Sequence, residues 1–506
     1  MTSSNGNPFS TEHLRVGLRD HAVRSTGITL SAQAVKLFFQ IASITILARL
    51  LEPADFGLVA MVTIFTGLAT TFVDGGLSMA TIQRPEITHA QVSNLFWINV
   101  ALGIGLCLLA VGLAPVLAWM YDESRLVAIM LAMSVAFIIG GLSVQHDALL
   151  RRQMRFKAIA AIDVTSMVIG VCGGVATAWL GFGYWALVVM PVTTILIQTC
   201  MRWWLVAWWP SLASRGSGVR PLLVFGLNLS GANSVGYFAM NLTPFVISFI
   251  GGAQSLGLYN RANTLTQIPS SQLLPPLMNV MQSALARIAE DPPRLRRAIV
   301  SLMRKVALLG MFLTISMAVM ADWLVALFLG DGWEGAVPIF RMLALFSIVE
   351  PVAGFTAITL IAVGNARAVL RWKLITVAIL VASLALGSVW GVMGVVAAYA
   401  LSGVFIRLPL FLAYASRYLP VSLRDFVRAL APALACAGVT LAVLVGLRML
   451  AEPGSPLAGL LIFTPIALAA YLLTALTMKS LRSELLEMVG AVNLLLKRKH
   501  ERDSKS

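Results

Sequence analysis

The chain has 506 residues, of which 58% are hydrophobic and only 12% are charged, and its formal net charge is +15. A soluble globular protein carries about 25% charged residues. This composition, with a mean hydropathy of +0.86, therefore excludes an ordinary soluble protein. The basic residues are scattered among short gaps between apolar runs, which argues against a surface that binds nucleic acid.

Apolar runs rich in Leu, Ala, Val and Ile recur along the whole chain. A helix needs about 20 residues to cross about 30 Å of hydrocarbon. Only helices and closed barrels satisfy their backbone in lipid, and these runs lack the short alternation of barrel strands. The sequence therefore predicts an all-α integral membrane protein with about 14 transmembrane helices. In chain order, the predicted spans are residues 27–50, 56–80, 95–119, 126–145, 158–180, 184–208, 222–250, 256–286, 306–329, 336–363, 374–390, 392–414, 429–449 and 457–478.

These spans predict an organisation in six parts. The first 27 residues are polar and contain no apolar segment of the kind found in signal peptides, so we expect none to be cleaved. The six parts are a cytoplasmic N-terminal segment (1–26), an N-terminal lobe of six spans (27–208), a cytoplasmic linker (209–221), a C-terminal lobe of six spans (222–415), two further spans (429–478) and a basic cytoplasmic tail (479–506).

The distribution of Lys and Arg between alternate loops predicts how the chain lies across the membrane. With the N-terminus in the cytoplasm, 31 of the 37 Lys and Arg residues fall in cytoplasmic segments, Arg407 among them. The six others are Lys36, Arg49, Arg125, Arg261, Arg341 and Arg448. The outer loops are instead acidic, with Asp122, Glu123, Asp322, Asp331 and Glu334. Both termini are therefore predicted to be cytoplasmic.

Polar residues recur at helical spacing inside the first, second, seventh and eighth predicted spans. In the first span, Gln33, Lys36 and Gln40 lie three and four residues apart, so they share one face of a helix. A polar stripe that faces lipid is costly, so we expect these faces to line a water-filled cavity. The residues predicted to bind substrate there are Lys36, Arg261, Gln33, Gln40, Asn241, Asn263 and Gln267.

Several of these features also have a simpler interpretation. Lys36 is close enough to the inner end of its span to snorkel to the membrane surface. Arg261 is near enough to the outer edge of its span to act as an interfacial anchor. Stripes of Ser and Thr, such as that of the second span, can hold helices together at about 0.6 kcal/mol per hydrogen bond.

Two carboxylates inside predicted spans are candidates for coupling transport to an ion gradient. Asp74 belongs to the polar face of the second span, and Glu350 precedes Pro351 in the tenth. A buried carboxyl group can exchange a proton near neutral pH because burial disfavours its charged form. The alternative for Glu350 is a hydrogen-bonded packing role.

The sequence contains no pattern typical of catalysis or cofactor binding. Its five histidines lie in the termini or at cytoplasmic helix ends, without HExxH or another metal-ligand spacing. No GxxxxGK[ST] loop is present, and the four cysteines lack CxxC spacing and are interpreted as packing residues. We therefore expect no enzyme activity, no catalytic residue, no metal site and no cofactor.

Two segments of the chain indicate an internal repeat. Residues 38–57 read FFQIASITILARLLEPADFG and residues 238–257 read FAMNLTPFVISFIGGAQSLG, so that Gly57 and Gly257 end the two segments. Six spans separate the copies, and this even number predicts parallel repeats of one orientation. Chance similarity between two hydrophobic segments is the alternative.

Several stretches resemble one known family. They are ILARLLEPADFGLVAMV from Ile46, FVDGGLSMATIQRPEIT from Phe72, LFWIN from Leu95, ALLRRQMRFKAIA from Ala148, LGFGYWALV from Leu180 and LGLYNRANTL from Leu256. These stretches are similar to the polysaccharide-export flippases of the multidrug/oligosaccharidyl-lipid/polysaccharide superfamily, in the branch of colanic-acid, lipopolysaccharide and exopolysaccharide exporters. The resemblance covers about residues 20–280 and is carried by topology beyond them.

The resemblance implies two six-helix lobes that face each other in a V, with two extra C-terminal helices. It implies that an undecaprenyl-diphosphate-linked oligosaccharide crosses the bacterial inner membrane by alternating access, for lipopolysaccharide or exopolysaccharide biosynthesis. Related flippases line their cavity with cationic residues of the first and eighth helices, where this chain has Lys36 and Arg261. Further implied partners are membrane lipids, a polysaccharide polymerase and a chain-length regulator.

Two other functions remain open at this point. A cation-coupled exporter of small drugs or metabolites would have the same superfamily fold. A membrane enzyme is the third candidate, but a polymerase would carry a large outer loop and an acyltransferase would need a histidine at membrane depth. The predicted topology provides neither feature.

Overall fold

The structure is a computed structural model, and it describes residues 18–84, 86–214, 218, 220–347, 349–450 and 453–487. The described residues do not cover all of the predicted N-terminal segment, linker and tail. They leave out residues 1–17, 215–217, 219 and 488–506 of these parts. The described secondary structure is helical throughout, so the predicted all-α class is confirmed. The chain divides into two compact units, one with the residues up to Gly257 and Phe328–Gly330, the other with Leu258–Leu327 and the residues from Asp331.

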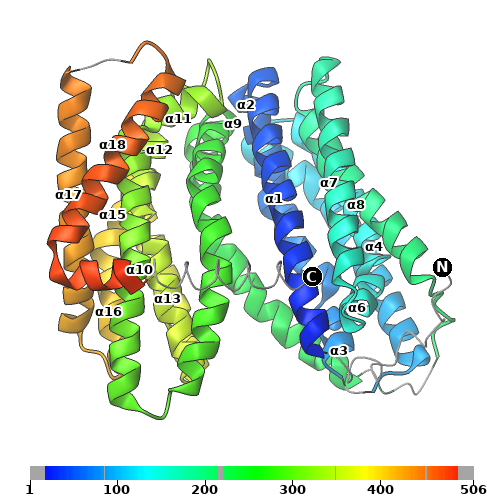
Figure 1. Cartoon of the computed structure of the whole chain (residues 1–506). Coiled ribbons are helices and arrows are strands. Elements are labelled where there is room, and N and C mark those ends of the chain that lie inside the picture. The colour runs from blue at the N-terminus through cyan, green and yellow to red at the C-terminus, as the bar shows by residue number, and fades with distance from the viewer. Residues whose placement is uncertain are drawn as a thin grey trace, which may run out of the picture. The chain divides into compact units, whose positions relative to one another are not determined.

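The described residues of the first unit form eight helices and the N-terminal part of a ninth, which Figure 1 labels. Within it, α1, α7 and α8 pack in series, and α5 packs against α2, α4 and α8. The bounds are α1 Leu18–Leu50, α2 Pro53–Asp74, α3 Leu77–Gln83, α4 His89–Tyr121, α5 Arg125–Gly141, α6 Val144–Arg152, α7 Phe156–Trp179, α8 Trp185–Val206 and α9 Arg220–Arg287.

The second unit contains the C-terminal part of α9 and the remaining helices. Within it, α10 packs against α12, α13 and α17, and α14 packs against α15. The bounds are α10 Pro292–Val319, α11 Ala321–Phe328, α12 Ala336–Phe346, α13 Val349–Ala362, α14 Ala366–Ser388, α15 Gly391–Ser402, the π-helix η2 Gly403–Arg407, α16 Leu408–Ala415, α17 Leu423–Leu450 and α18 Pro456–Thr477.

Twelve helices among the described residues are long and apolar enough to cross a membrane, and the bent pair α5–α6 raises this number to 13. The difference from the predicted 14 lies in α9, which counts once although it has 68 residues. At 1.5 Å per residue, its two helical parts together amount to about 100 Å of helix, enough for two crossings. Gly252 interrupts its helical backbone with φ 65° and ψ −165°, between the predicted seventh and eighth spans. The count of 14 stays a prediction.

Local sequence determines where several helices begin. Thr88 precedes α4, and its hydroxyl accepts a hydrogen bond from the backbone NH of Gln91, whose side chain accepts one from the Thr88 NH. This reciprocal arrangement satisfies two NH groups that have no partner in the first helical turn. Asp291 and Ser455 precede α10 and α18. The side chain of each accepts one hydrogen bond from a backbone NH of the first turn, and proline follows each of them.

Two glycines bring α2 and α9 into backbone contact inside the first unit. A Cβ atom added to Gly57 would lie 1.7 Å from the carbonyl oxygen of Ala253. One added to Gly257 would lie 1.8 Å from the carbonyl oxygen of Pro53. The contact is reciprocal, since each glycine meets the residue that lies four positions before the other. Gly57 and Gly257 are also the residues that end the two segments of the predicted repeat.

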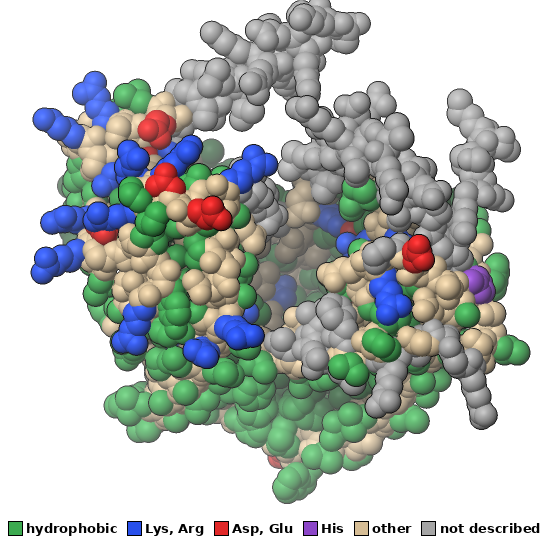
Figure 2. All heavy atoms as spheres, turned by 90° about the horizontal axis from the view of Figure 1, so that it is seen from below, with side chains coloured by type: hydrophobic (Ala, Val, Ile, Leu, Met, Phe, Trp, Pro, Cys, Tyr) green, Lys and Arg blue, Asp and Glu red, His purple; other side chains and the backbone are tan. Residues whose placement is uncertain are grey.

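Lysine and arginine side chains gather at one end of the second unit, over the ends of α10, α14 and α17 (Figure 2). Acidic side chains hold several of them: Arg296 binds Asp425 at 2.7 Å, and Lys305 binds Glu484 at 3.1 Å and Glu487 at 2.8 Å. The predicted topology assigns these helix ends to the cytoplasmic side, and their positive charge accords with that assignment. The orientation of the termini stays a prediction.

Candidate functional site

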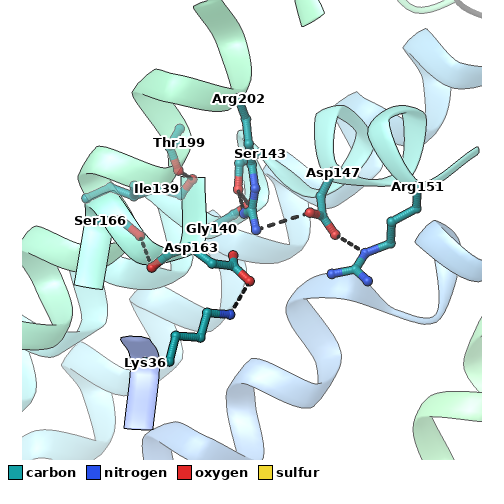
Figure 3. A network of polar contacts seen from close by, with 10 residues as sticks. All are labelled: Lys36, Ile139, Gly140, Ser143, Asp147, Arg151, Asp163, Ser166, Thr199 and Arg202. Atoms are coloured by element: carbon teal, nitrogen blue, oxygen red, sulfur yellow. Dashed lines mark hydrogen bonds and ion pairs between the residues drawn. The ribbon is translucent and has the colours of Figure 1, made fainter. Parts of the chain in front are cut away.

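Lys36 of α1 forms an ion pair with Asp163 of α7, with its Nζ atom 2.6 Å from a carboxylate oxygen. Figure 3 shows the two side chains pointing toward each other. Both residues lie in helices able to span a membrane, and their side chains are 30% and 27% exposed. Lys36 is therefore paired with the neighbouring helix, whereas snorkelling would direct its side chain to the membrane surface.

A second group of charges lies beside this pair. Asp147 of α6 accepts a hydrogen bond from Arg151 at 2.7 Å and lies 3.2 Å from Arg202 of α8 (Figure 3). Asp147 is thus neutralised by two arginines. Among the described residues, the carboxylate of Asp163 has one hydrogen-bond partner, and that partner is Lys36. Sequence reasoning missed Asp163, although an acidic residue inside a predicted span is a signal that could have revealed it.

The other predicted substrate-binding residues of the first unit have different surroundings. Gln33 is exposed and Gln40 is half-buried, and both lie on α1 with Lys36 between them. Asn241 of α9 donates a hydrogen bond to the Tyr237 carbonyl of its own helix at 2.9 Å. The structure thus places three predicted residues on one helix and gives Asn241 a partner within α9.

Asp74 lies where the second predicted span breaks. α2 ends at this residue, Gly75 and Gly76 adopt positive φ angles of 55° and 64°, and α3 follows. The Asp74 carboxylate accepts hydrogen bonds from the backbone NH of Ser78 at 2.9 Å and from its hydroxyl at 2.7 Å. Asp74 therefore satisfies the first turn of α3, and its part in ion coupling stays a prediction.

Buried polar side chains satisfy the backbone at the same break. Asn99 of α4 donates hydrogen bonds to the carbonyls of Val73 at 2.9 Å and Asp74 at 3.0 Å. Gln145 donates to Asn99 at 2.8 Å and accepts from Thr81 at 2.8 Å. These three polar side chains are fully buried. They replace the helical hydrogen bonds that the two glycines interrupt, as a break in a membrane helix requires.

In the second unit, two residues predicted for different roles meet. Gln267 of α9 donates a hydrogen bond to the Glu350 carboxylate of α13 at 2.8 Å. Arg261, one helical turn and a half earlier on α9, donates to the side-chain oxygen of Asn260 at 2.9 Å. Asn263 is half-buried. The structure thus joins a predicted substrate-binding residue to a predicted coupling carboxylate.

Arg407 ends the π-helix η2 inside the candidate span Gly391–Ala415 and is only 9% exposed. Its guanidinium lies over the ring of Phe346, 5.1 Å from the centroid. The predicted topology counts Arg407 with the cytoplasmic charges, and this side stays a prediction. The structure places Arg407 about 12 Å from the C-terminal end of the candidate span, where aromatic faces stabilise its charge. Its position inside an apolar run was the available signal, and π-turns occur frequently at functional sites.

On the predicted outer side, two basic residues are paired with acids. Arg448 of α17 binds Asp322, and its guanidinium lies 4.4 Å from the centroid of the Trp323 ring. Arg125 binds Glu123 at 2.7 Å, and this hydrogen-bonded guanidinium holds the pKa of the Glu123 carboxyl below its usual range. These contacts fasten helix ends and leave no excess of positive charge at these positions.

A basic pocket lies in the second unit where α9 turns into α10. Its volume is about 740 Å³, and exposed Arg287, Arg294 and Arg297 line it together with Ser301. The predicted topology places this pocket at the cytoplasmic membrane surface, where basic residues attract anionic lipid head groups. Among the described residues, no group of three or more His, Cys, Asp and Glu side chains could hold a metal ion.

Comparison with known proteins places this arrangement in a family. Residues 46–338, more than half of the chain, match the family described as "Polysaccharide biosynthesis protein". The lipopolysaccharide biosynthesis protein WzxC of Escherichia coli K12 is 25% identical over 343 residues, which cover 67% of this chain and 69% of WzxC. The succinoglycan biosynthesis transport protein ExoT of Rhizobium meliloti is 24% identical over 373 residues, covering 73% of this chain and 74% of ExoT.

A solved structure shows the same fold. The lipid II flippase MurJ in an inward closed conformation superimposes with a TM-score of 0.71 over 90% of this chain and 98% of MurJ, at 12% sequence identity. The family resemblance first visible in the sequence is confirmed at the level of polysaccharide biosynthesis proteins. The chain is therefore a multi-pass membrane protein that belongs to the family of polysaccharide biosynthesis proteins.

Proposed function

We propose that this protein is a flippase that moves an undecaprenyl-diphosphate-linked oligosaccharide across the bacterial inner membrane. The names of WzxC and ExoT assign them to lipopolysaccharide biosynthesis and to transport in succinoglycan biosynthesis, and MurJ is a lipid II flippase. These relatives support a polysaccharide precursor on a lipid carrier as the substrate. The product would serve lipopolysaccharide or exopolysaccharide biosynthesis.

The observation that carries the proposal is the partly exposed Lys36 inside a membrane-spanning helix. A diphosphate is anionic and cannot enter hydrocarbon unaided, because an uncompensated charge is costly there. A cation near 4 Å from an anion contributes roughly 4 kcal/mol at an effective dielectric constant of about 20, before desolvation. Lys36 would lower the barrier for the head group while the prenyl chain stays in lipid.

The proposal also gives roles to the other residues predicted to bind substrate. Arg261 would be the cationic residue of the second unit, and the predicted lobes, residues 27–208 and 222–415, would expose the head group alternately to each side. The oligosaccharide offers hydroxyl groups, which amide side chains recognise by hydrogen bonds. The amides proposed for this contact are Gln33, Gln40, Asn241, Asn263 and Gln267.

Ion coupling and membrane context complete the proposal. Glu350 is the preferred coupling carboxylate, because its partner Gln267 lies on the same helix as Arg261. Asp74 is the alternative, although Ser78 already occupies its carboxylate. Both termini would be cytoplasmic, the basic pocket would bind inner-leaflet lipids, and a polysaccharide polymerase and a chain-length regulator would act on the exported product.

A cation-coupled exporter of small drugs or metabolites is the second candidate. The contact between Gln267 and Glu350 favours it, because a carboxylate in a membrane helix can bind a proton or another cation. Lys36 argues against it as the main function, since a lysine in the site repels cationic drugs and attracts anionic lipids. The two candidates therefore predict opposite charge preferences.

Reconstitution separates the candidates directly. The full chain is incorporated into vesicles that contain undecaprenyl-diphosphate-linked oligosaccharide, and the fraction of glycan accessible to an external glycosidase is followed with time. We expect faster exposure than in protein-free vesicles, and no uptake of a cationic dye such as ethidium. Dye transport without glycan movement would contradict the proposal and favour the drug exporter.

A further inference from the structure

We propose that Asp163 is a displaceable counter-ion for the head-group site, which holds Lys36 when the site is empty and gives it up to the substrate diphosphate. The inference rests on the proposed function, because it concerns the same lysine. It adds a residue that regulates how tightly the site binds the substrate diphosphate and how readily the site releases it. No charge other than those of the two side chains and the diphosphate is required for the exchange.

The geometry fits a pair that opens. Lys36 and Asp163 are in direct contact at 2.6 Å, yet their side chains are 30% and 27% exposed. A substrate can therefore approach the ammonium group without first unpacking the two helices.

Asp163 contacts Lys36 and no other charged side chain among the described residues. Arg151 and Arg202 contact Asp147 instead, at 2.7 Å and 3.2 Å, and the charge of Arg151 acts on Asp163 only from a greater distance. The hydroxyl of Ser166 donates to the backbone carbonyl of Asp163 rather than to its carboxylate. Figure 3 shows Asp163 between these groups, with its carboxylate directed to Lys36. Lys36 is therefore the one hydrogen-bonded partner of the Asp163 carboxylate among the described residues, so that release of Lys36 leaves this carboxylate available to take it back.

Charge decides the direction of the exchange. The attraction of the ammonium group for an anion increases with the charge of that anion, and a diphosphate carries more negative charge than one carboxylate. The substrate therefore displaces Asp163. Once displaced, Asp163 is an uncompensated anion beside the bound diphosphate and repels it. A transport site must bind strongly enough to admit its substrate and weakly enough to release it, and Asp163 would supply the second property.

The test measures binding of undecaprenyl diphosphate to the purified full-length protein in nanodiscs. We expect Lys36→Ala to raise the dissociation constant about tenfold or more, and Asp163→Asn to lower it about fivefold to tenfold. Flipping by Asp163→Asn should nevertheless be slower than wild type, because release becomes limiting. Asp163→Glu keeps the charge and should bind within about twofold of wild type. Asp331→Asn is the matched control, since it removes one exposed acidic charge elsewhere.

A double-mutant cycle tests whether Asp163 affects binding through Lys36. In the Lys36→Ala background there is no ammonium group to compete for, so the tightening caused by Asp163→Asn should largely disappear. Asp163→Ser, which is neutral and smaller, tests the same point if Asp163→Asn does not fold. Unchanged binding by Lys36→Ala would overturn the head-group site of the proposed function. Weaker binding by Lys36→Ala together with unchanged or weaker binding by Asp163→Asn would overturn only the counter-ion role.

Discussion

The guanidinium carbon of Arg407 lies 4.8 Å from the centroid of the Tyr399 ring, and its Nη2 atom donates a hydrogen bond to the Tyr399 carbonyl at 2.6 Å. Phe346 covers the same guanidinium, and it can approach because Gly403 has no side chain: a Cβ atom there would lie 1.9 Å from the Phe346 ring. Two aromatic rings and one backbone carbonyl thus surround the Arg407 guanidinium inside a membrane helix, and Gly403 leaves room for one of the rings.

Phe346→Leu should destabilise the second unit because it removes an aromatic face and leaves the charge buried. In a double-mutant cycle with Arg407→Met, we expect a coupling of about 0.5–2 kcal/mol in the free energy of unfolding. Thermal unfolding in detergent measures it. Phe405→Leu is the control, since Phe405 belongs to the same π-helix but is 71% exposed. Additive effects of Phe346→Leu and Arg407→Met would exclude a cation–π contribution.

Lys36→Ala should reduce flipping severely, and Lys36→Arg should retain more activity, because the site needs a positive charge more than a particular shape. The assay is the exposure of glycan in reconstituted vesicles. Lys157→Ala removes the same charge from an exposed position on α7 and should leave the rate unchanged. Arg261→Ala is expected to lower the rate as well. Wild-type rates for Lys36→Ala and Arg261→Ala, alone and together, would show that both are anchors, provided that the variants accumulate normally.

Glu350→Gln should abolish the dependence of flipping on an ion gradient, because glutamine keeps the hydrogen-bonding shape but cannot exchange a proton. Asp74→Asn should retain coupling but lower the free energy of unfolding by about 1 kcal/mol, since the first turn of α3 loses a charged acceptor. Export with and without an uncoupler measures the first effect, and thermal unfolding measures the second. Full, uncoupler-sensitive export by both variants would rule out an essential carboxylate at these positions.

Reporter fusions should place the loops as the charge distribution predicts. Fusions at Ser217, which lies outside the described residues, and at Ala298 should be active only as cytoplasmic reporters. A fusion at Gly332 should behave as periplasmic. A periplasmic signal at Ser217 would invert every later span and overturn the topology.

Periodicity and hydropathy predicted the helical class and nearly all spans, because each span satisfies its own backbone and must be apolar for about 20 residues. The breaks were harder to predict. In the sequence, Gly75, Gly76 and Gly252 fit either close packing or a turn, and all three adopt positive φ in the structure, as a turn requires. The hydrogen bonds that stabilise the break after Asp74 come from Asn99, 25 residues away, and local patterns contain no such information.

Only the polar face of one helix in the candidate site could be predicted from the sequence. The spacing of Gln33, Lys36 and Gln40 defines a polar face within a single helix. The partner of Lys36 depends on how α7 is rotated against α1, and Asp163 is 127 residues away. The same limit applied to Arg407, whose aromatic partner Phe346 belongs to another helix. Tertiary packing decides such pairs, and one sequence does not reveal it.

The packing of Gly57 on Ala253 and of Gly257 on Pro53 limits how the two segments can diverge from each other over evolutionary time. A larger side chain at either glycine meets a main-chain carbonyl, which is present whatever residue occupies the opposite position. No second substitution can therefore compensate for the first, as it could if two side chains collided. Descendants of this chain that keep the fold are expected to retain both glycines, even where the surrounding helices have lost all detectable similarity.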